Sequence, residues 1–199
     1  MNEFTLREAK SFRPQIDMKK ADKRPGYYKW WCPYDLMPTV LGKLDFKLED
    51  APLEIKEING NKYYCIYIGI AVNEPLMKRL DWHINETHTK SKIEHRTLST
   101  LRQSVAAICC GNMKNEAAVN AFIDQLYVEY KFVDAEIKSD KAKQDIKDNW
   151  ETKNLVAGAE YFYPLNIQDN KHTLATTKSC KKLKELRKAA RETALKHFN

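Results

Sequence analysis

The sequence predicts a mixed fold of the α/β class, more narrowly α+β, in which helices flank a small central sheet of three mostly antiparallel strands. Short apolar runs at 27–31, 63–70 and 128–132 have the length and the tyrosine-rich composition of strands. Between and after them, apolar residues recur every three or four positions, as in amphipathic helices. No internal repeat is visible. We therefore expect one domain that spans residues 1–199.

Turn residues and side chains with particular backbone preferences delimit these elements. Pro25-Gly26 opens the first strand, and Asn59-Gly60 is a hairpin signal just before the second. Pro75 indicates the first turn of a helix that carries Arg79 and His83 on one face. Three residues are predicted to begin helices as N-caps: Asn73, Asn115 and Ser139. Gly111 is predicted to end a helix.

Two further segments are defined by composition. Residues 1–24 are polar and charged, so we expect an arm or a short helix laid on the domain. Residues 32–57 contain three prolines and an acidic cluster, which indicates an insertion between the first two strands.

Positive charge is concentrated at the end of the chain. The net charge is +7, and residues 178–199 hold eight lysines and arginines against Glu185 and Glu192. A basic helix of this kind commonly lies on phosphate groups. It could equally be the solvated face of a packed helix, because Leu183 and Ala190 belong to an apolar stripe. Charge alone leaves both interpretations open.

The remaining composition predicts a cytoplasmic protein without a membrane partner. No run approaches the roughly 18 apolar residues of a membrane span, and residues 1–7 lack the layout of a signal peptide. The five cysteines form no paired framework and no C-x-x-C zinc motif. We expect reduced thiols.

Two tripeptides connect the chain with a known family. Gly26-Tyr27-Tyr28 and Tyr67-Ile68-Gly69 resemble the two signatures of the GIY-YIG nuclease superfamily, with Tyr27 in place of the middle isoleucine. Arg79 is close to the position of the family's usual arginine, and His83 resembles a histidine of some restriction-enzyme members.

Later residues extend the resemblance over 25–171. Glu151 resembles the family's metal-binding glutamate, and Asn166 resembles its terminal asparagine. Residues 166–171 are also similar to the nuclease half of the bacterial excision-repair incision subunit.

The resemblance implies a metal-dependent endonuclease that hydrolyses DNA phosphodiester bonds. Tyr28 would be the base or the water-orienting group and Tyr67 its partner, although these roles could be exchanged. Arg79 would bind the phosphate, and His83 would donate to it or accept a proton. The supporting residues would be Gly69 and Asn166.

One carboxylate, Glu151, would hold one Mg²⁺ or Mn²⁺, which suits a cation that keeps several waters. Glu160 ranks second as a metal ligand.

Duplex DNA is the expected partner; a homodimer would suit double-strand cutting, although no sequence feature shows one. The predicted nucleic-acid contacts are Lys29, Lys90, Lys92, Arg96, Lys171, Lys181, Lys182 and Arg187. Two alternatives stay open: a non-catalytic nucleic-acid-binding module on the same fold, and a protein-interaction domain with the acidic insertion as its partner surface.

Overall fold

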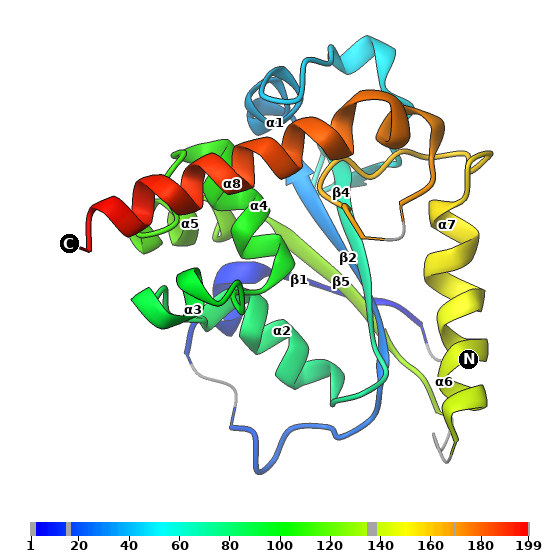
Figure 1. Ribbon diagram of the computed structural model, residues 1–199. Helices are drawn as coiled ribbons and strands as arrows, with labels where there is room; N and C mark the ends of the chain where they lie inside the picture. Colours follow the sequence, from blue (N-terminus) through cyan, green and yellow to red (C-terminus); the bar gives the residue numbers. More distant parts are fainter. Residues whose placement is uncertain (1–2, 15–16, 135–138, 169, 199) are drawn as a thin grey trace.

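The computed structural model describes residues 3–14, 17–134, 139–168 and 170–198, and it confirms helices around an antiparallel sheet (Figure 1). The sheet order is β1-β5-β2-β4-β3, with every neighbouring pair antiparallel. The strands are β1 (Thr5–Glu8), β2 (Gly26–Pro33), β3 (Ile55–Ile58), β4 (Asn61–Ala71) and β5 (Tyr127–Phe132). The three predicted strands are β2, β4 and β5, at the centre.

The prediction of only three strands was wrong because it missed both edge strands. β1 lies in the segment expected to be an arm or a helix, and β3 lies at the end of the expected insertion. Each is four residues long and largely exposed, so neither needs the apolar run that marks a buried strand. The hairpin turn between β3 and β4 is confirmed, with positive φ at Asn59 (51°) and Gly60 (78°).

The helices include two that the sequence did not predict, α1 and α3, and one predicted cap is corrected. They are α1 (Met37–Gly42), α2 (Leu76–Asn85), α3 (Lys90–Glu94), α4 (Thr100–Cys109), α5 (Glu116–Ile123), α6 (Asp140–Lys147), α7 (Lys153–Leu155) and α8 (Cys180–Lys196). Asn115 and Ser139 cap α5 and α6 as predicted. The Asn73 cap was wrong: Pro75 occupies the N-cap position of α2, and no side chain caps it.

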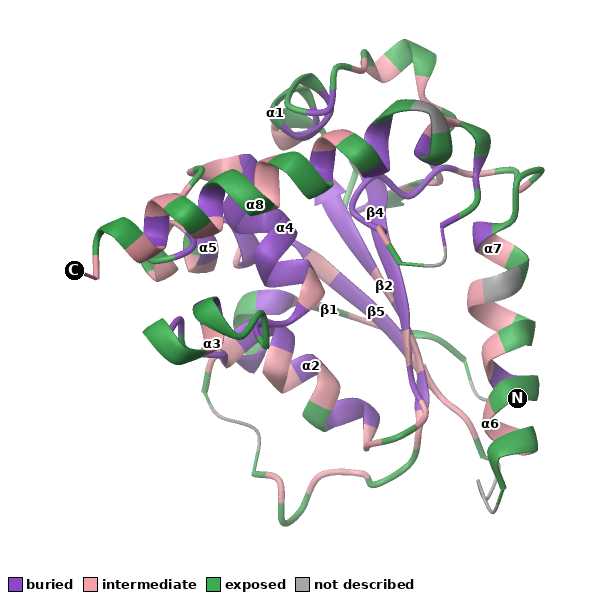
Figure 2. Cartoon of the chain, viewed as in Figure 1, coloured by how far each residue is buried: buried purple, intermediate pink, exposed green. Residues whose placement is uncertain are grey.

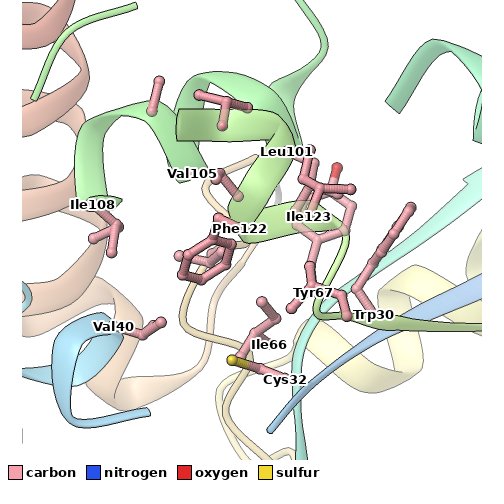
Figure 3. Close-up of a cluster of buried hydrophobic side chains, with 14 of the residues drawn as sticks. Trp30, Cys32, Val40, Ile66, Tyr67, Leu101, Val105, Ile108, Phe122 and Ile123 are labelled. Atoms are coloured by element: carbon pink, nitrogen blue, oxygen red, sulfur yellow. The ribbon is translucent and has the colours of Figure 1, made fainter. Parts of the chain in front are cut away.

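Helices cover both faces of the sheet. Figure 1 shows α2, α4, α5 and α8 on one side and α6 with α7 on the other. The larger core lies between β2, β4 and the first group, where Trp30, Cys32 and Ile66 face Leu101, Val105, Phe122 and Ile123 (Figure 3). A smaller cluster on the second face contains Trp31, Cys65, Ile68 and Leu155. The central strands are therefore buried over much of their length, with partly exposed residues mainly toward their ends (Figure 2).

The insertion and the basic helix both belong to the packed structure. Met37 and Val40 of α1 are fully buried in the larger core. Leu183 and Ala190 of α8 are buried as well, where α8 lies along α4. The apolar stripe of α8 thus packs, and its remaining faces carry the positive charge. None of the described helices is long and apolar enough to cross a membrane, and all five cysteines are free.

A buried arginine holds the carboxyl end of α2. Arg102 is fully buried, and its Nη1 donates to the carbonyl oxygens of His83 (3.2 Å) and Ile84 (2.8 Å). A cation at this end of a helix also complements the helix dipole. Its Nε donates to His88 Nε2 at 2.8 Å. Because α2 carries Arg79 and His83, this anchor fixes both of them.

The contacts of His88 require a neutral ring. Its Nδ1 lies 2.5 Å from the carbonyl oxygen of Met113, so Nδ1–H donates there and the lone pair of Nε2 accepts from Arg102. Burial, and then Arg102, lower the pKa of His88 to about 4. The unfolded chain takes up a proton below about pH 6.5, and the folded chain does so only near pH 4.

Stability from His88 is therefore complete above pH 6.5 and is lost as the pH falls toward 4. Between pH 7 and pH 5 we expect His88 to contribute a fall of about 2 kcal/mol in the free energy of unfolding, measured with urea. His88→Gln keeps an acceptor for Arg102 and does not titrate, so its fall should be smaller by that amount. Equal pH dependence in the two proteins would contradict the assignment.

Candidate active site

The strand register places the two signature tyrosines on one face of the sheet. Tyr28 of β2 lies opposite Gly69 of β4, and Trp30 lies opposite Tyr67. The centres of the Tyr28 and Tyr67 rings are 6.3 Å apart. A Cβ on Gly69 would lie 2.3 Å from both Cζ and the hydroxyl oxygen of Tyr28. Glycine at this position therefore lets the Tyr28 phenol lie directly over β4.

His83 of α2 contacts the hydroxyl group of Tyr28. The Tyr28 hydroxyl oxygen and His83 Nε2 are 2.9 Å apart, and both side chains are buried. Burial, followed by Arg79 and Arg102, holds the pKa of His83 well below its usual value, so the ring is neutral at pH 7. Its Nδ1 has no hydrogen-bond partner within the described part of the chain. No neighbour there fixes the tautomer, so Nε2 is able to donate or to accept.

A polar cavity of about 220 Å³ opens beside the two phenols. Its lining residues are Tyr28, Tyr67, Ile70, Val72, Asn73, Arg79, Thr100, Lys147, Glu151, Asn166, Ile167 and Gln168. Four of the five predicted catalytic side chains thus meet in one pocket, and His83 lies behind Tyr28 as a second layer.

The Glu151 carboxylate and the two phenols interact electrostatically. Burial, and then the Glu151 charge, raise the pKa of Tyr67 to about 12, while Arg79 and Arg187 act in the opposite direction. The pKa of Tyr28 is also raised well above its usual value, by burial and then by Tyr67. Both phenols therefore stay protonated at neutral pH.

Glu151 lies in a π-helical turn, Asp148–Thr152, between α6 and α7. Such a turn adds a residue to the helical repeat and changes the direction of the side chains it carries; π-turns are frequent at functional sites. Trp150 in the same turn stacks on Tyr27 (4.7 Å) and on Phe4 (5.7 Å). These aromatic contacts hold the turn against the sheet.

Arg79 reaches the pocket from α2 with a partner already in place. Its Nη2 lies 2.5 Å from Glu74 Oε1, and its guanidinium lies 4.7 Å from the centre of the Trp82 ring. The side chain is 27% exposed. Arg79 is therefore oriented by an ion pair and an aromatic surface and still faces the cavity.

Asn166 hydrogen-bonds to the backbone of β4 along the edge that β3 does not cover. β3 pairs only with residues 61–64, so the later residues of β4 have no strand on that side. Asn166 Oδ1 accepts from Ile68 N–H, and Nδ2 donates to Ile68 C=O, both at 2.9 Å. Leu165 N–H donates to Ile66 C=O. The amide therefore attaches the pocket wall formed by 166–168 to the strand.

The donors around the pocket fit a hard cation held mainly by water and substrate. Within the described ranges, no three or more acidic, histidine or cysteine side chains lie so that they could hold a metal ion together. Among the described lining residues Glu151 is the one carboxylate, with amide and hydroxyl oxygens at Asn73, Thr100 and Gln168. One carboxylate with oxygen neighbours suits Mg²⁺, which retains several waters, and does not suit an all-protein cage.

The predicted nucleic-acid contacts are divided among different surfaces. Arg96 and Arg187 line a larger groove next to the pocket. Lys29 lies on the opposite face of the sheet, where its Nζ is 2.5 Å from Glu54 Oε1. Lys92 pairs with Glu86 at 3.4 Å.

The remaining predicted contacts also lie away from the groove. Lys182 pairs with Asp45 at 3.2 Å, and Lys181 lines the same shallow pocket. Lys90 and Lys171 are exposed and line neither the cavity nor the groove.

Sequence reasoning missed three residues of this site. Lys147 precedes Glu151 by four positions and lines the pocket, a helical spacing that could have identified it. Trp150 could have been found as the aromatic neighbour of Glu151. Arg102 carried no such signal, because an arginine within an apolar helical pattern is usually exposed.

Two phenols, a guanidinium and a carboxylate around one polar pocket are the parts required to orient water and offset charge on a phosphodiester. The arrangement fits a hydrolytic class of site, and comparison with known proteins gives the family. The model of the GIY-YIG catalytic domain matches residues 26–189, so the chain belongs to the GIY-YIG nuclease family. No curated protein and no solved structure matches the chain significantly. The resemblance is confirmed, and the match includes the first half of α8.

The close approach of Tyr28 to β4 predicts a large effect of one added methyl group. Gly69→Ala would force the phenol aside and should lower the free energy of unfolding by about 1–3 kcal/mol. Gly158→Ala is the matched control, because a Cβ there meets nothing within 4 Å; its change should stay within about 0.5 kcal/mol. Urea unfolding measures both, and equal effects would show that the Tyr28–Gly69 contact is not tight.

Proposed function

We propose that the protein is a divalent-metal-dependent endonuclease that hydrolyses phosphodiester bonds of duplex DNA. The observation that carries the proposal is the convergence of Tyr28, Tyr67, Arg79 and Glu151 on one polar cavity. Membership of the nuclease family supports the general activity. Metal use, duplex DNA and the assignment of roles are inferred from the pocket.

Glu151 would hold one Mg²⁺ or Mn²⁺, with water and a substrate phosphate oxygen as the other ligands. When bound, the ion supplies Lewis-acid stabilisation of the charge on the phosphate and on the leaving oxygen. Lys147, on the same pocket wall, adds positive charge next to the carboxylate.

Arg79 binds a non-bridging phosphate oxygen. Its contact with Glu74 leaves further guanidinium N–H groups, and the Trp82 ring limits its rotation. A charge-assisted hydrogen bond from a guanidinium oriented in advance loses little freedom when the negative charge increases in the transition state.

Tyr28 and His83 activate the attacking water as a relay. A free phenol is a poor base, because its reference pKa of about 10 leaves it protonated, and burial raises the pKa of Tyr28 further. The relay avoids the phenolate: the water proton moves to the Tyr28 oxygen while the Tyr28 proton moves to His83 Nε2, 2.9 Å away. His83 is neutral and so able to accept. The negative phosphate offsets the nearby Arg79 charge and makes the imidazole more basic.

Tyr67 orients the same water. It lies on the same strand face as Tyr28 and is the slightly more exposed of the two phenols. The Glu151 charge raises the pKa of Tyr67 and the Arg79 charge lowers it, so the Tyr67 phenol interacts electrostatically with both groups.

Glu151 should be required for cleavage and Glu160 should not. We expect Glu151→Gln to lower the rate of supercoiled-plasmid nicking or linearisation by at least about 10²-fold, at about 50 mM salt with Mg²⁺ or Mn²⁺. A chelator should abolish cleavage by the wild type. Glu160→Gln is the control, because Glu160 is exposed and outside the pocket. Bound but uncut plasmid with wild-type protein would instead indicate a non-catalytic nucleic-acid-binding module.

The relay predicts that His83 acts through proton transfer as well as through its hydrogen bond. His83→Gln retains a group able to hydrogen-bond Tyr28 but cannot accept a proton at neutral pH. We expect its single-turnover cleavage rate to fall by roughly 10²-fold or more, with thermal stability and duplex affinity close to wild type. Wild-type cleavage by this variant would reduce His83 to a support for Tyr28.

A further inference from the structure

The second cavity of the molecule is a groove of about 810 Å³ between α8 and the elements that carry Arg79 and Thr100. Its lining is Arg79, Trp82, Arg96, Thr97, Leu98, Ser99, Thr100, Gln103, Lys184, Arg187, Lys188 and Arg191. Six of these side chains are lysine or arginine, and none is acidic. Positive charge gathered without acidic residues indicates an anionic ligand.

The groove joins the candidate active site. Arg79 and Thr100 line both the groove and the smaller cavity with Tyr28 and Glu151. A chain of phosphates that places one phosphate at Arg79 would therefore continue into the groove.

Arg187 lies in the groove without an acidic partner. The side chain is half-buried, it donates from Nη2 to Gln103 Oε1 at 2.5 Å, and no carboxylate pairs with it within the described ranges. Burial lowers the pKa of Arg187 to about 10, as expected for a cation with reduced hydration. A partly dehydrated arginine held by a neutral amide is suited to a phosphate.

The opposite side of α8 also carries lysines, but acidic side chains lie among them. Lys178, Lys181 and Lys182 share a shallow pocket with Asp45 and Glu185, and Lys182 pairs with Asp45. Acidic neighbours offset the positive charge on this side. The pocket on this side thus includes Asp45 and Glu185 in its lining, whereas the described lining of the groove has no carboxylate. Two groove cations have acidic partners outside the lining: Arg79 pairs with Glu74, and Lys188 lies 3.9 Å from Glu192.

We propose that the groove binds the sugar–phosphate backbone of the DNA strand on one side of the scissile phosphate. Lys184, Lys188 and Arg191 lie along α8, and the first and last are seven positions apart, about 10 Å at 1.5 Å per residue. About three phosphates of one strand fit this length at 3.4 Å per phosphate along the duplex axis. The inference rests on the proposed nuclease function for the identity of the scissile phosphate.

The test compares two triple variants that each remove three positive charges near or on α8. The groove variant is K184A/K188A/R191A, and the control is K178A/K181A/K182A. Binding to a random-sequence 30-base-pair DNA duplex is measured by fluorescence anisotropy from about 50 to 300 mM salt. We expect the groove variant to lose roughly 10²-fold in affinity at about 100 mM salt, with the salt slope smaller by about 2–3. The control should stay within a few-fold of wild type.

Equal losses in both variants, an unchanged slope in the groove variant, or no duplex binding by the wild type would overturn the groove proposal. Thermal melting checks that both variants fold, which we expect because Lys184 and Lys188 are exposed and Arg191 is only half-buried.

Plasmid cleavage separates this inference from the proposed function. If the wild type cleaves, the groove variant should raise KM and leave kcat within about threefold, because its residues do not reach the reacting atoms. If the wild type binds duplex through the groove but does not cleave with Mg²⁺ or Mn²⁺, the nuclease proposal fails and the groove assignment stands. If it cleaves and the groove variant has an unchanged KM, the groove assignment fails alone.

Discussion

The close contact between the Tyr28 phenol and Gly69 is the constraint on which the site depends. The phenol occupies the space where any residue other than glycine at position 69 would place its Cβ. The position of Tyr28 therefore requires the observed register of β2 against β4. His83 then contacts the Tyr28 hydroxyl only because α2 crosses this face of the sheet at the right height. Arg102 fixes that height by holding the last carbonyl groups of α2. A pair of strands, a helix and one buried cation together position the candidate catalytic groups.

Three arginines show how the environment separates structural from binding roles. Arg102 is fully buried, and all its hydrogen bonds go to carbonyl, amide and imidazole groups. Arg79 has one carboxylate partner and retains free capacity toward the cavity. Arg187 has an amide partner and faces the groove. All three have the same chemistry, and the surrounding acceptors decide which of them has capacity for a phosphate.

The central part of the fold could be predicted from the sequence because burial leaves a strong pattern. The apolar runs of β2, β4 and β5 are buried on both faces, and the caps at Asn115 and Ser139 follow from side-chain hydrogen bonding to the backbone. The edge strands could not be predicted, because each is fixed by backbone pairing to one neighbour and places few demands on its side chains. Likewise, sequence gives Lys29 and Lys182 a charge but not the carboxylates of Glu54 and Asp45 that they meet. The candidate catalytic residues were identified from motifs, whereas their separation into a pocket layer and His83 behind it required the structure.

α8 can combine a structural role with the proposed binding role because a helix has more than two faces. Leu183, Ala190 and Ala194 pack it along α4, so these positions cannot vary in size without disturbing the larger core. The positions between them are free of that demand, and their charges are distributed by what they face: Asp45 and Glu185 on one side, the groove on the other. The two interpretations of the basic helix are therefore not exclusive. Packing holds the helix along α4, and a fixed row of cations next to Arg79 would bind a regular phosphate chain with less loss of freedom than a flexible tail would.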